Sequence, residues 1–417
     1  MSKRFITLAL LVAALFSFSA GALAKTTVSL YSWWEVKPGQ PLVILKEAFE
    51  KANPDIELNM VSLPADGYYD KILTMVAGGN PPDISMLAMD QLAVYASKNA
   101  LTNLDPYIKK YKYPVDDLYP VVKEIVTYKG HIWALPRDVT SNAIYYNKKL
   151  FDEAGVPYPK PGWTWDDFLE TAKKLTKYDA NGKPIQWGFS FPTYPDGYYD
   201  WLLQNNGGFV NKDATKSIVN TPETIEALQF LQDLMYKYKV APTPAQAQEF
   251  GSSSAAPFSQ QKTAMYLAGV SRMGNFIKQG LDFDMAEVPR KKRQACRIWS
   301  NLWVIPKGAK NPDAAFRVIA WLAGPEGQSL AVDLNMGMAG LQSVGKNHKK
   351  FIDPPPANKQ AYIRAFEYGV PFPVFPQSSE FFAMANRELD LVWSGQRSAK
   401  EAAAAIDKQA PAILNQR

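Results

Sequence analysis

The chain has 417 residues, which is enough for two domains that each bury a core of their own. Its 46 lysines and arginines nearly balance its 40 aspartates and glutamates, so neither nucleic acid nor a membrane surface is expected as the main partner. The single cysteine, Cys296, excludes an intramolecular disulfide, and stability must therefore come from the size of the cores.

The first 24 residues have the pattern of a secretory signal peptide. Lys3 and Arg4 precede an apolar run over residues 5–20, and Ala22 to Ala24 form a small-x-small cleavage site. The run is shorter than the roughly 20 residues that a membrane-spanning helix needs. No cysteine lies at the cleavage site, so a lipid anchor is not indicated. We expect cleavage near Ala24 and a soluble periplasmic protein.

Strands alternate with helices through the first hundred residues. A strand over 26–34 precedes a helix over 41–51, and a strand over 56–63, a helix over 69–77 and a short strand over 83–90 follow. This order predicts βαβ units and a mostly parallel sheet, whose ligands bind outside the carboxyl ends of the strands. Three side chains lie at such ends: Trp33, Trp34 and Asp90.

The two adjacent tryptophans need an explanation. Successive side chains of a strand point to opposite faces, so both indoles cannot enter one core if the strand continues through them. One of them is expected to face solvent or a ligand. Alternation does not decide which one, since the strand can also end at Ser32.

The second half of the chain contains a new set of elements. Residues 129–151 have two extended halves around Arg137 to Asn142, which predicts a crossing between domains. A capping box of Thr164 and Asp167 begins one helix, and Thr221 caps a longer one. A strand over 283–288, a second extended pass over 297–306 and a helix over 311–324 precede a helical C-terminus from about residue 377.

Catalytic fingerprints are mostly absent from the sequence. It contains no GxSxG, HExxH or GxxxxGK motif and no GxGxxG after a strand. His131 and His348 are isolated, so neither a metal nor a cofactor is expected. A glycosidase needs only two carboxylates and leaves no local motif, and Asp90 and Asp138 are candidates for such a pair. A secreted glycosidase or lyase therefore stays an alternative.

Aromatic residues are abundant, with 11 Trp, 21 Tyr and 21 Phe. Indole and phenol planes suit the C–H face of a sugar, and planar carboxylate, amide and guanidinium groups suit its hydroxyls. Several predicted loops at strand ends carry such pairs, which favours a carbohydrate site: Trp33 and Trp34, Tyr198 and Tyr199, Trp299 and Trp303, Phe381 and Phe382.

Five segments in this order resemble a known family: GGNPPDISML, IYYNKKLFDEAGVP, WTWDDFLETAKKLT, QKTAMYLAG and NLWVIPKGAKNPDAAFRVIAWLAGPEGQ. The series is similar to the extracellular solute-binding proteins of carbohydrate ABC importers, the maltose-binding-protein-like group. The resemblance implies a type II periplasmic binding protein fold, in which two α/β lobes, each a mostly parallel sheet flanked by helices, are joined by hinge strands. It also implies a monomeric receptor without enzymatic activity that captures a sugar between the lobes and delivers it to a membrane permease.

The two predicted crossings divide the chain into discontinuous lobes. We expect the signal peptide over 1–24, the N-terminal lobe over 25–138 plus 301–341, and the C-terminal lobe over 139–300 plus 342–417.

The resemblance carries over to individual positions. Asp90 corresponds to the acid that often holds sugar hydroxyls, Arg137 and Asp138 to the loop at the first crossing, and Phe382 to a C-terminal stacking aromatic. A tryptophan commonly follows QKTAMYLAG, whereas this chain has Val270, Ser271 and Arg272. The predicted ligand-binding residues are Trp33, Trp34, Asp90, Arg137, Asp138, Tyr198, Asp200, Arg272, Trp299, Asn301 and Phe382.

The charge of the ligand stays open at this point. Arg137 and Arg272 suit an acidic or phosphorylated solute, such as a uronate oligosaccharide or a glycerol phosphate, but guanidinium groups also donate to neutral hydroxyls. A neutral sugar is the favoured reading. A polyamine is disfavoured, because it would need acids rather than arginines in the cleft.

Overall fold

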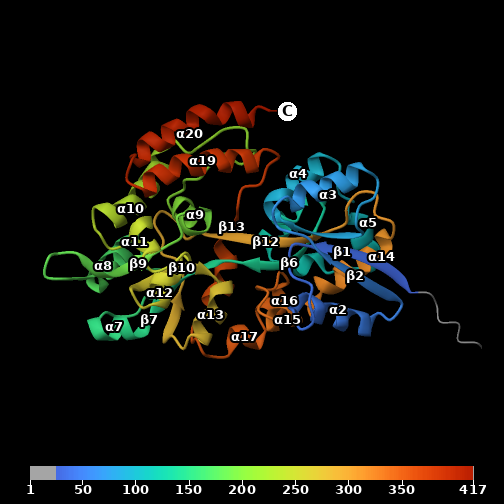
Figure 1. Cartoon of the computed structure of the whole chain (residues 1–417), viewed down its shortest axis with the longest axis horizontal. Coiled ribbons are helices and arrows are strands. Elements are labelled where there is room, and N and C mark those ends of the chain that lie inside the picture. Colours follow the sequence, from blue (N-terminus) through green and yellow to red (C-terminus); the bar gives the residue numbers. More distant parts are fainter. Residues whose placement is uncertain (1–24, 417) are drawn as a thin grey trace, which may run out of the picture.

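The structure, a computed structural model, describes residues 25–416, and the predicted signal peptide lies outside the described residues. Two lobes lie side by side, with the N-terminal residues in one and the two C-terminal helices in the other (Figure 1). Among the helices of residues 25–416, none has the length and apolar character to cross a membrane.

The first lobe is built on a sheet of the order β13-β12-β3-β1-β2, with β6 also paired to β12. In β1, Val28, Leu30 and Ser32 are buried in alternation, which gives the strand one core face. The strands of this sheet are β1 (Thr26–Ser32), β2 (Ile56–Ser62), β3 (Ile84–Ala88), β6 (Leu135–Thr140), β12 (Cys296–Val304) and β13 (Gly369–Pro371).

Helices cover this sheet, and α2, α14 and α15 pack against one another beside it. The first lobe also contains these helices and a two-stranded sheet of β4 and β5. They are α2 (Pro41–Ala52), α3 (Tyr68–Ala77), η1 (Met89–Gln91), α4 (Leu92–Ser97), α5 (Asp105–Tyr111), η2 (Val115–Asp117), α6 (Pro120–Ile125), β4 (Thr127–Tyr128), β5 (His131–Ile132), α14 (Pro312–Leu322), α15 (Pro325–Asp333), α16 (Gln342–Gly345) and α17 (Lys349–Ile352).

The second lobe has a five-stranded sheet of the order β11-β7-β10-β9-β8. Its strands are β7 (Asn142–Asn147), β8 (Lys177–Tyr178), β9 (Pro184–Ser190), β10 (Thr263–Gly269) and β11 (Phe283–Ala286). Its helices are α7 (Lys148–Ala154), α8 (Trp165–Leu175), α9 (Pro195–Gln204), α10 (Pro222–Tyr236), α11 (Pro244–Gln248), α12 (Ala256–Ser259), η3 (Val270–Arg272), α13 (Met273–Lys278), α18 (Ala361–Arg364), η4 (Ala365–Tyr368), α19 (Ser378–Trp393) and α20 (Ala399–Leu414).

The predicted helix starts are confirmed where a cap marks them. Thr164 and Asp167 form the expected capping box at α8, Thr221 accepts from the backbone of Thr224 at α10, and Ser398 forms a capping box at α20. The extended segment predicted over residues 129–151 ends earlier in the structure, at Asn147. Helix α7 begins at Lys148, because the Asn147 side chain caps it by accepting from the Leu150 N–H at 3.1 Å.

Both sheets contain more antiparallel pairs than the strand–helix alternation predicts. The core strands β1, β2 and β3 are parallel, but β12 runs antiparallel to β3 and β6, and β7 runs antiparallel to β10 and β11. The cause is that the chain crosses between the lobes. β12 returns from the second lobe and therefore runs opposite to β3 and β6 in the first sheet.

The chain passes between the lobes three times, and β13, which pairs with residues 296–298 at the start of β12, lies at the junction and adds no further passage (Figure 1). β6 belongs to the first sheet and β7 to the second, with only Ser141 between them, and β12 brings the chain back. The third passage leads from α16 to α18, which contacts β7. Because α16 still bonds Asp117 and Leu118, contacts with the first lobe extend past residue 341. The lobe boundaries stay a prediction.

Candidate functional site: the cleft between the lobes

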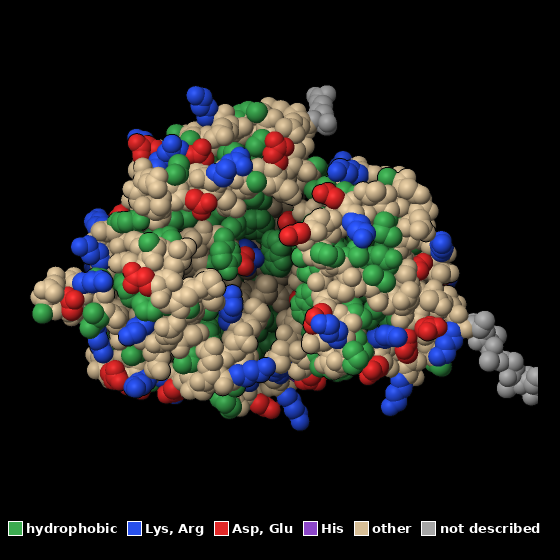
Figure 2. Space-filling view, viewed as in Figure 1, with side chains coloured by type: hydrophobic (Ala, Val, Ile, Leu, Met, Phe, Trp, Pro, Cys, Tyr) green, Lys and Arg blue, Asp and Glu red, His purple; other side chains and the backbone are tan. Residues whose placement is uncertain are grey.

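Figure 2 shows a hollow between the two lobes, with hydrophobic side chains on its walls. The crossing strands β6 and β12 lie at this junction, and their register aligns Trp299 with Thr140 and Asn301 with Asp138. The sequence therefore brings together Arg137, Asp138, Trp299 and Asn301, although the two segments are about 160 residues apart along the chain. The register of the two strands places four of the predicted site residues at the hinge.

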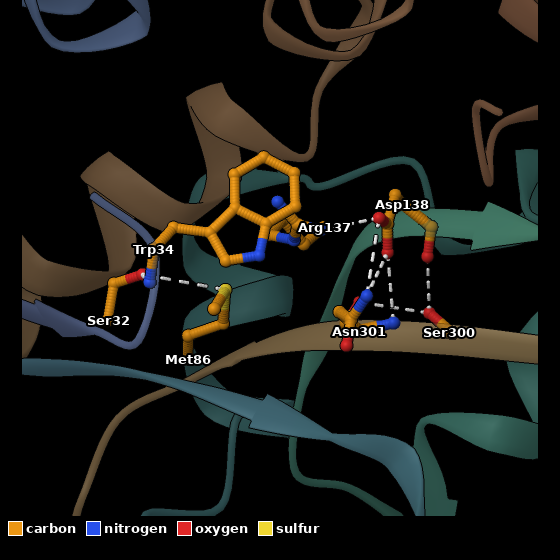
Figure 3. Close-up of polar contacts among 7 residues, drawn as sticks. All are labelled: Ser32, Trp34, Met86, Arg137, Asp138, Ser300 and Asn301. Atoms are coloured by element: carbon orange, nitrogen blue, oxygen red, sulfur yellow. Dashed lines mark hydrogen bonds and ion pairs between the residues drawn. The ribbon is translucent and has the colours of Figure 1, made fainter. Parts of the chain in front are cut away.

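Asp138 organises this group of polar side chains (Figure 3). Its Oδ1 accepts from the backbone N–H and the side-chain amide of Asn301, each at 3.0 Å, and its Oδ2 accepts from Arg137 Nη2 at 2.5 Å. Gly337 makes room for this carboxylate, because a Cβ there would lie 2.7 Å from the Asp138 Cβ. Asp138 therefore orients Arg137 and Asn301, and its oxygens are already occupied.

Trp34 lies over the guanidinium of Arg137, with the Arg137 Cζ 4.0 Å from the ring centroid (Figure 3). β1 has ended at Ser32, whose Oγ accepts from the Trp34 N–H at 2.9 Å and turns the backbone toward this position. The arginine is buried, and burial lowers its pKa while Asp138 raises it. Within residues 25–416 its Nε and Nη1 have no hydrogen-bond partner. These donors suit hydroxyl acceptors.

Trp33 packs differently from Trp34. Its ring meets Tyr68 and Tyr69 edge to face, with centroids 5.1 and 5.7 Å apart. Asp90 lies near Tyr69, and its negative charge, together with burial as the larger cause, raises the pKa of that phenol. Burial also raises the pKa of Asp90, whose Oδ1 is enclosed and has no partner in the described part of the chain. A sugar hydroxyl could satisfy this oxygen.

An aromatic cluster continues from Trp299 away from the hinge. Trp299 contacts Phe372 at 5.8 Å between centroids, and Phe372 contacts Phe382 at 4.6 Å. Phe372 also lines a cavity of about 310 Å³ to which both lobes contribute, with Met89 on one side and Tyr199 on the other. Phe382 is therefore packed behind Phe372, while Trp299 is only partly buried.

Tyr198 and Asp200 are not in the cleft, contrary to their prediction as ligand-binding residues. Both lie in α9, of which residues 197–204 are all buried. The Tyr198 hydroxyl donates to Asn386 at 2.8 Å. Asp200 accepts from the Asn142 side-chain amide at 2.8 Å and from the Arg297 N–H at 2.5 Å. Asp200 thus connects β7 to β12 inside the second lobe, and burial raises its pKa to about 6.

Arg272 is half-buried and lies in η3, directly after β10 of the second sheet. It lines a cavity of about 320 Å³ together with Tyr194 and the loop that contains Ser252 to Ser254. The structure thus places Arg272 beside an open space, but not in the cluster at the hinge.

Sequence reasoning missed three residues near the site: Tyr69, Arg297 and Phe372. The guanidinium of Arg297 pairs with Asp196 at 3.1 Å and lies 5.6 Å from the Trp299 ring. A charged residue at the start of the predicted extended pass over 297–306 was the available signal for Arg297. Tyr69 and Phe372 gave no signal, because each resembles an ordinary core aromatic until its neighbours are known.

The model of the bacterial extracellular solute-binding protein family matches residues 33–329. This chain belongs to that family. The solute-binding protein from Pyrococcus abyssi called maltotriose-binding protein is 27% identical over 318 residues, which cover 72% of this chain and 64% of that protein. The aligned part thus spans a little under two thirds of that relative.

Two further relatives cover more of their length. A maltooligosaccharide ABC transporter solute-binding lipoprotein from Streptococcus pneumoniae is 26% identical over 86% of this chain and 82% of its own. An ABC substrate-binding protein from Listeria monocytogenes, solved in complex with cycloalternan, is 28% identical, covers 94% of this chain and 100% of its own, and has a TM-score of 0.82. The two-lobe α/β fold that the resemblance implied is confirmed, and so is the family of this solute-binding protein.

Proposed function

We propose that this solute-binding protein captures a sugar or oligosaccharide between its lobes and delivers it to an ABC transporter. The observation that carries the proposal is the stack of Trp34 on the buried Arg137, with two enclosed guanidinium nitrogens that find no hydrogen-bond partner within residues 25–416 and the Asn301 amide beside them. An indole face, guanidinium donors and a planar amide together match a ring with a hydroxyl rim. The sugar ligands in the names of the relatives support the same class.

The position of this cluster explains how capture is coupled to movement. Arg137, Asp138 and Asn301 lie on strands that join the lobes, Trp33 and Asp90 belong to the first lobe, and Arg272 belongs to the second. A ligand that contacts both lobes stabilises the closed form more than the open form, and it shifts the equilibrium by that difference in affinity.

A receptor fits the geometry better than a glycosidase. Asp138 is one of the two acids that could have formed a catalytic pair, but its oxygens are occupied by Asn301 and Arg137. It is therefore poorly placed to exchange a proton with a glycosidic oxygen or to attack a sugar. Chromatography after a long incubation with the bound oligosaccharide is expected to show intact sugar, and released products would support the glycosidase instead.

The partner and the compartment follow from the same proposal. The closed form would dock on a membrane permease, and the protein would act as a monomer in the periplasm after cleavage near Ala24. One relative is a lipoprotein, but here no cysteine is found at the predicted cleavage site. The division into lobes at about residues 138, 300 and 341 is part of the same proposal.

A thermal-shift screen against neutral and acidic mono- and oligosaccharides tests the function. A ligand at 100 times its dissociation constant stabilises the folded protein by about 2.7 kcal/mol. At least one sugar is expected to raise the unfolding midpoint, and amino acids, peptides and polyamines at equal concentration are expected not to do so. A panel in which only a non-sugar solute stabilises the protein would contradict the proposal.

A further inference from the structure

Arg272 lies between two cavities that contain no carboxylate. The first, of about 320 Å³, is also lined by Tyr194 and Ser254; the second, of about 420 Å³, is also lined by Asn275 and Gln279. Arg272 is the charged residue of both linings, and no ion pair or side-chain hydrogen bond of its guanidinium is found within residues 25–416. A half-buried guanidinium without a counter-ion attracts an anion.

We propose that Arg272 receives a negatively charged substituent of the sugar, a carboxylate or a sulfate, in the first of these cavities. The inference rests on the proposed carbohydrate-binding function, and it specifies the class of sugar. The ring would lie toward the hinge, where Trp34 and Arg137 are, and its anionic group would reach into the second lobe.

The position of the cavity in the sheet supports this placement. β9 and β10 are parallel neighbours, so their carboxyl ends lie at the same edge of the second sheet. Residues 191–194 follow β9 and Arg272 follows β10, and both line the cavity. Ligands of open α/β sheets bind outside such ends. The same edge adjoins the hinge, because a Cβ at Gly269 would lie 2.8 Å from the Thr140 hydroxyl oxygen.

The surrounding groups suit an anion. The Ser254 and Tyr266 hydroxyls lie 3.0 Å apart beside the cavity, and the positive charge of Arg272 acts on Tyr266, whose pKa burial raises to about 12. Asp196 is an acid near this edge, but it is paired with Arg297 at 3.1 Å and does not compensate Arg272. Hydroxyl donors beside a free guanidinium can solvate a carboxylate or sulfate that water no longer reaches.

The test compares matched sugars by calorimetry. In each of three pairs one member carries an anionic group at C6 where the other carries a hydroxymethyl group: digalacturonate and galactobiose of the same linkage, cellobiuronate and cellobiose, and glucose 6-sulfate and glucose. In the best pair the anionic member is expected to bind about 10- to 100-fold more tightly, as for a charge-assisted hydrogen bond. Its affinity should fall with added salt because the attraction is between charges. Comparison of the uronate pairs with the sulfate pair shows whether the cavity prefers a carboxylate or a sulfate.

Two variants assign the preference to Arg272. Arg272→Gln should abolish the preference for the anionic member of the pair, and Arg272→Lys should retain only part of it, because an ammonium lacks the planar fork. Arg387→Gln is the control, since it removes the same charge from an exposed position of α19. Inorganic phosphate alone tests whether the cavity binds an anion without a sugar, and equal affinity of free phosphate and the anionic sugar would contradict the proposal.

The outcomes separate this inference from the proposed function. Neutral sugars that bind as tightly as their anionic partners, or an unchanged preference in Arg272→Gln, would overturn the anion site and leave the carbohydrate receptor intact. No binding by any sugar, charged or neutral, would overturn both.

Discussion

The Asp138 carboxylate accepts hydrogen bonds from both the backbone and the side-chain amide of Asn301, each at 3.0 Å. These bonds join β6 to β12 at the junction of the lobes, and the same carboxylate neutralises the buried Arg137. Substitution Asp138→Asn removes the charge and leaves the guanidinium without a counter-ion. We expect the free energy of unfolding to fall by about 3–5 kcal/mol, as for other broken buried pairs.

Urea unfolding measures this change. Asp66→Asn is the matched control, because Asp66 is an exposed acid of the first lobe, and its substitution should change the free energy by no more than about 0.5 kcal/mol. A loss below 1 kcal/mol in Asp138→Asn would show that the ion pair does not hold the hinge strands.

The two adjacent tryptophans should respond differently to substitution. Trp34→Leu removes the indole from Arg137 and should weaken sugar binding and abolish the fluorescence change on ligand addition. Trp33→Leu removes the edge contacts with Tyr68 and Tyr69 and should lower stability while the fluorescence change persists. Titration of both variants with the best sugar of the screen checks this, and the reverse assignment would place Trp33 at the ligand.

Asp90 should matter for binding more than for folding. Burial raises the pKa of Asp90, which means that the ionised carboxylate destabilises the folded, ligand-free protein. Asp90→Asn removes this charge and should leave the free energy of unfolding at pH 7 unchanged or increase it. The affinity for the sugar should fall about 10- to 100-fold, because a charge-assisted hydrogen bond is lost. Calorimetry and thermal unfolding of the same sample measure the two effects, and unchanged affinity would remove Asp90 from the site.

Asp200 should make the stability depend on pH in a defined window. Its pKa rises from 3.8 to about 6 on folding, so the folded state binds the proton more tightly than the unfolded state. The contribution of Asp200 to the free energy of unfolding is fully present below about pH 4 and is lost as the pH rises to about 6. This contribution is at most about 3 kcal/mol. The difference in unfolding free energy between the wild type and Asp200→Asn, measured from pH 4 to 7, isolates this contribution. A difference that does not vary with pH would refute it.

Local elements were the most predictable part of the fold. Caps such as Thr164 with Asp167 act within four residues, so the sequence contains the whole signal and the structure agrees with it. The direction of strands was less predictable, because it depends on crossings between lobes rather than on local pattern. The hinge residues were found from an extended segment without helix signals, but the register that pairs Asp138 with Asn301 was not.

Individual site residues could be proposed from the sequence, but the contacts between distant segments could not. Tyr198 and Asp200 were misassigned because α9 is buried on every side, so an aromatic and polar sequence there does not indicate a face toward the cleft. The role of Asp138 could not be predicted, since its oxygens are satisfied by a residue 163 positions away. The different surroundings of Trp33 and Trp34 depend on the end of β1 at Ser32 and on contacts with α3 and Arg137.

The three passages of the chain between the lobes restrict how the lobes can move. Two lobes joined by one strand can rotate about any axis. Here three segments join the lobes: the passage through Ser141, β12, and the segment after α16. Together they restrict the lobes mainly to bending about one axis. With this restriction, an open form would sample few relative orientations of the lobes. Closing on a ligand then loses little orientational entropy, so more of the contact energy remains as affinity.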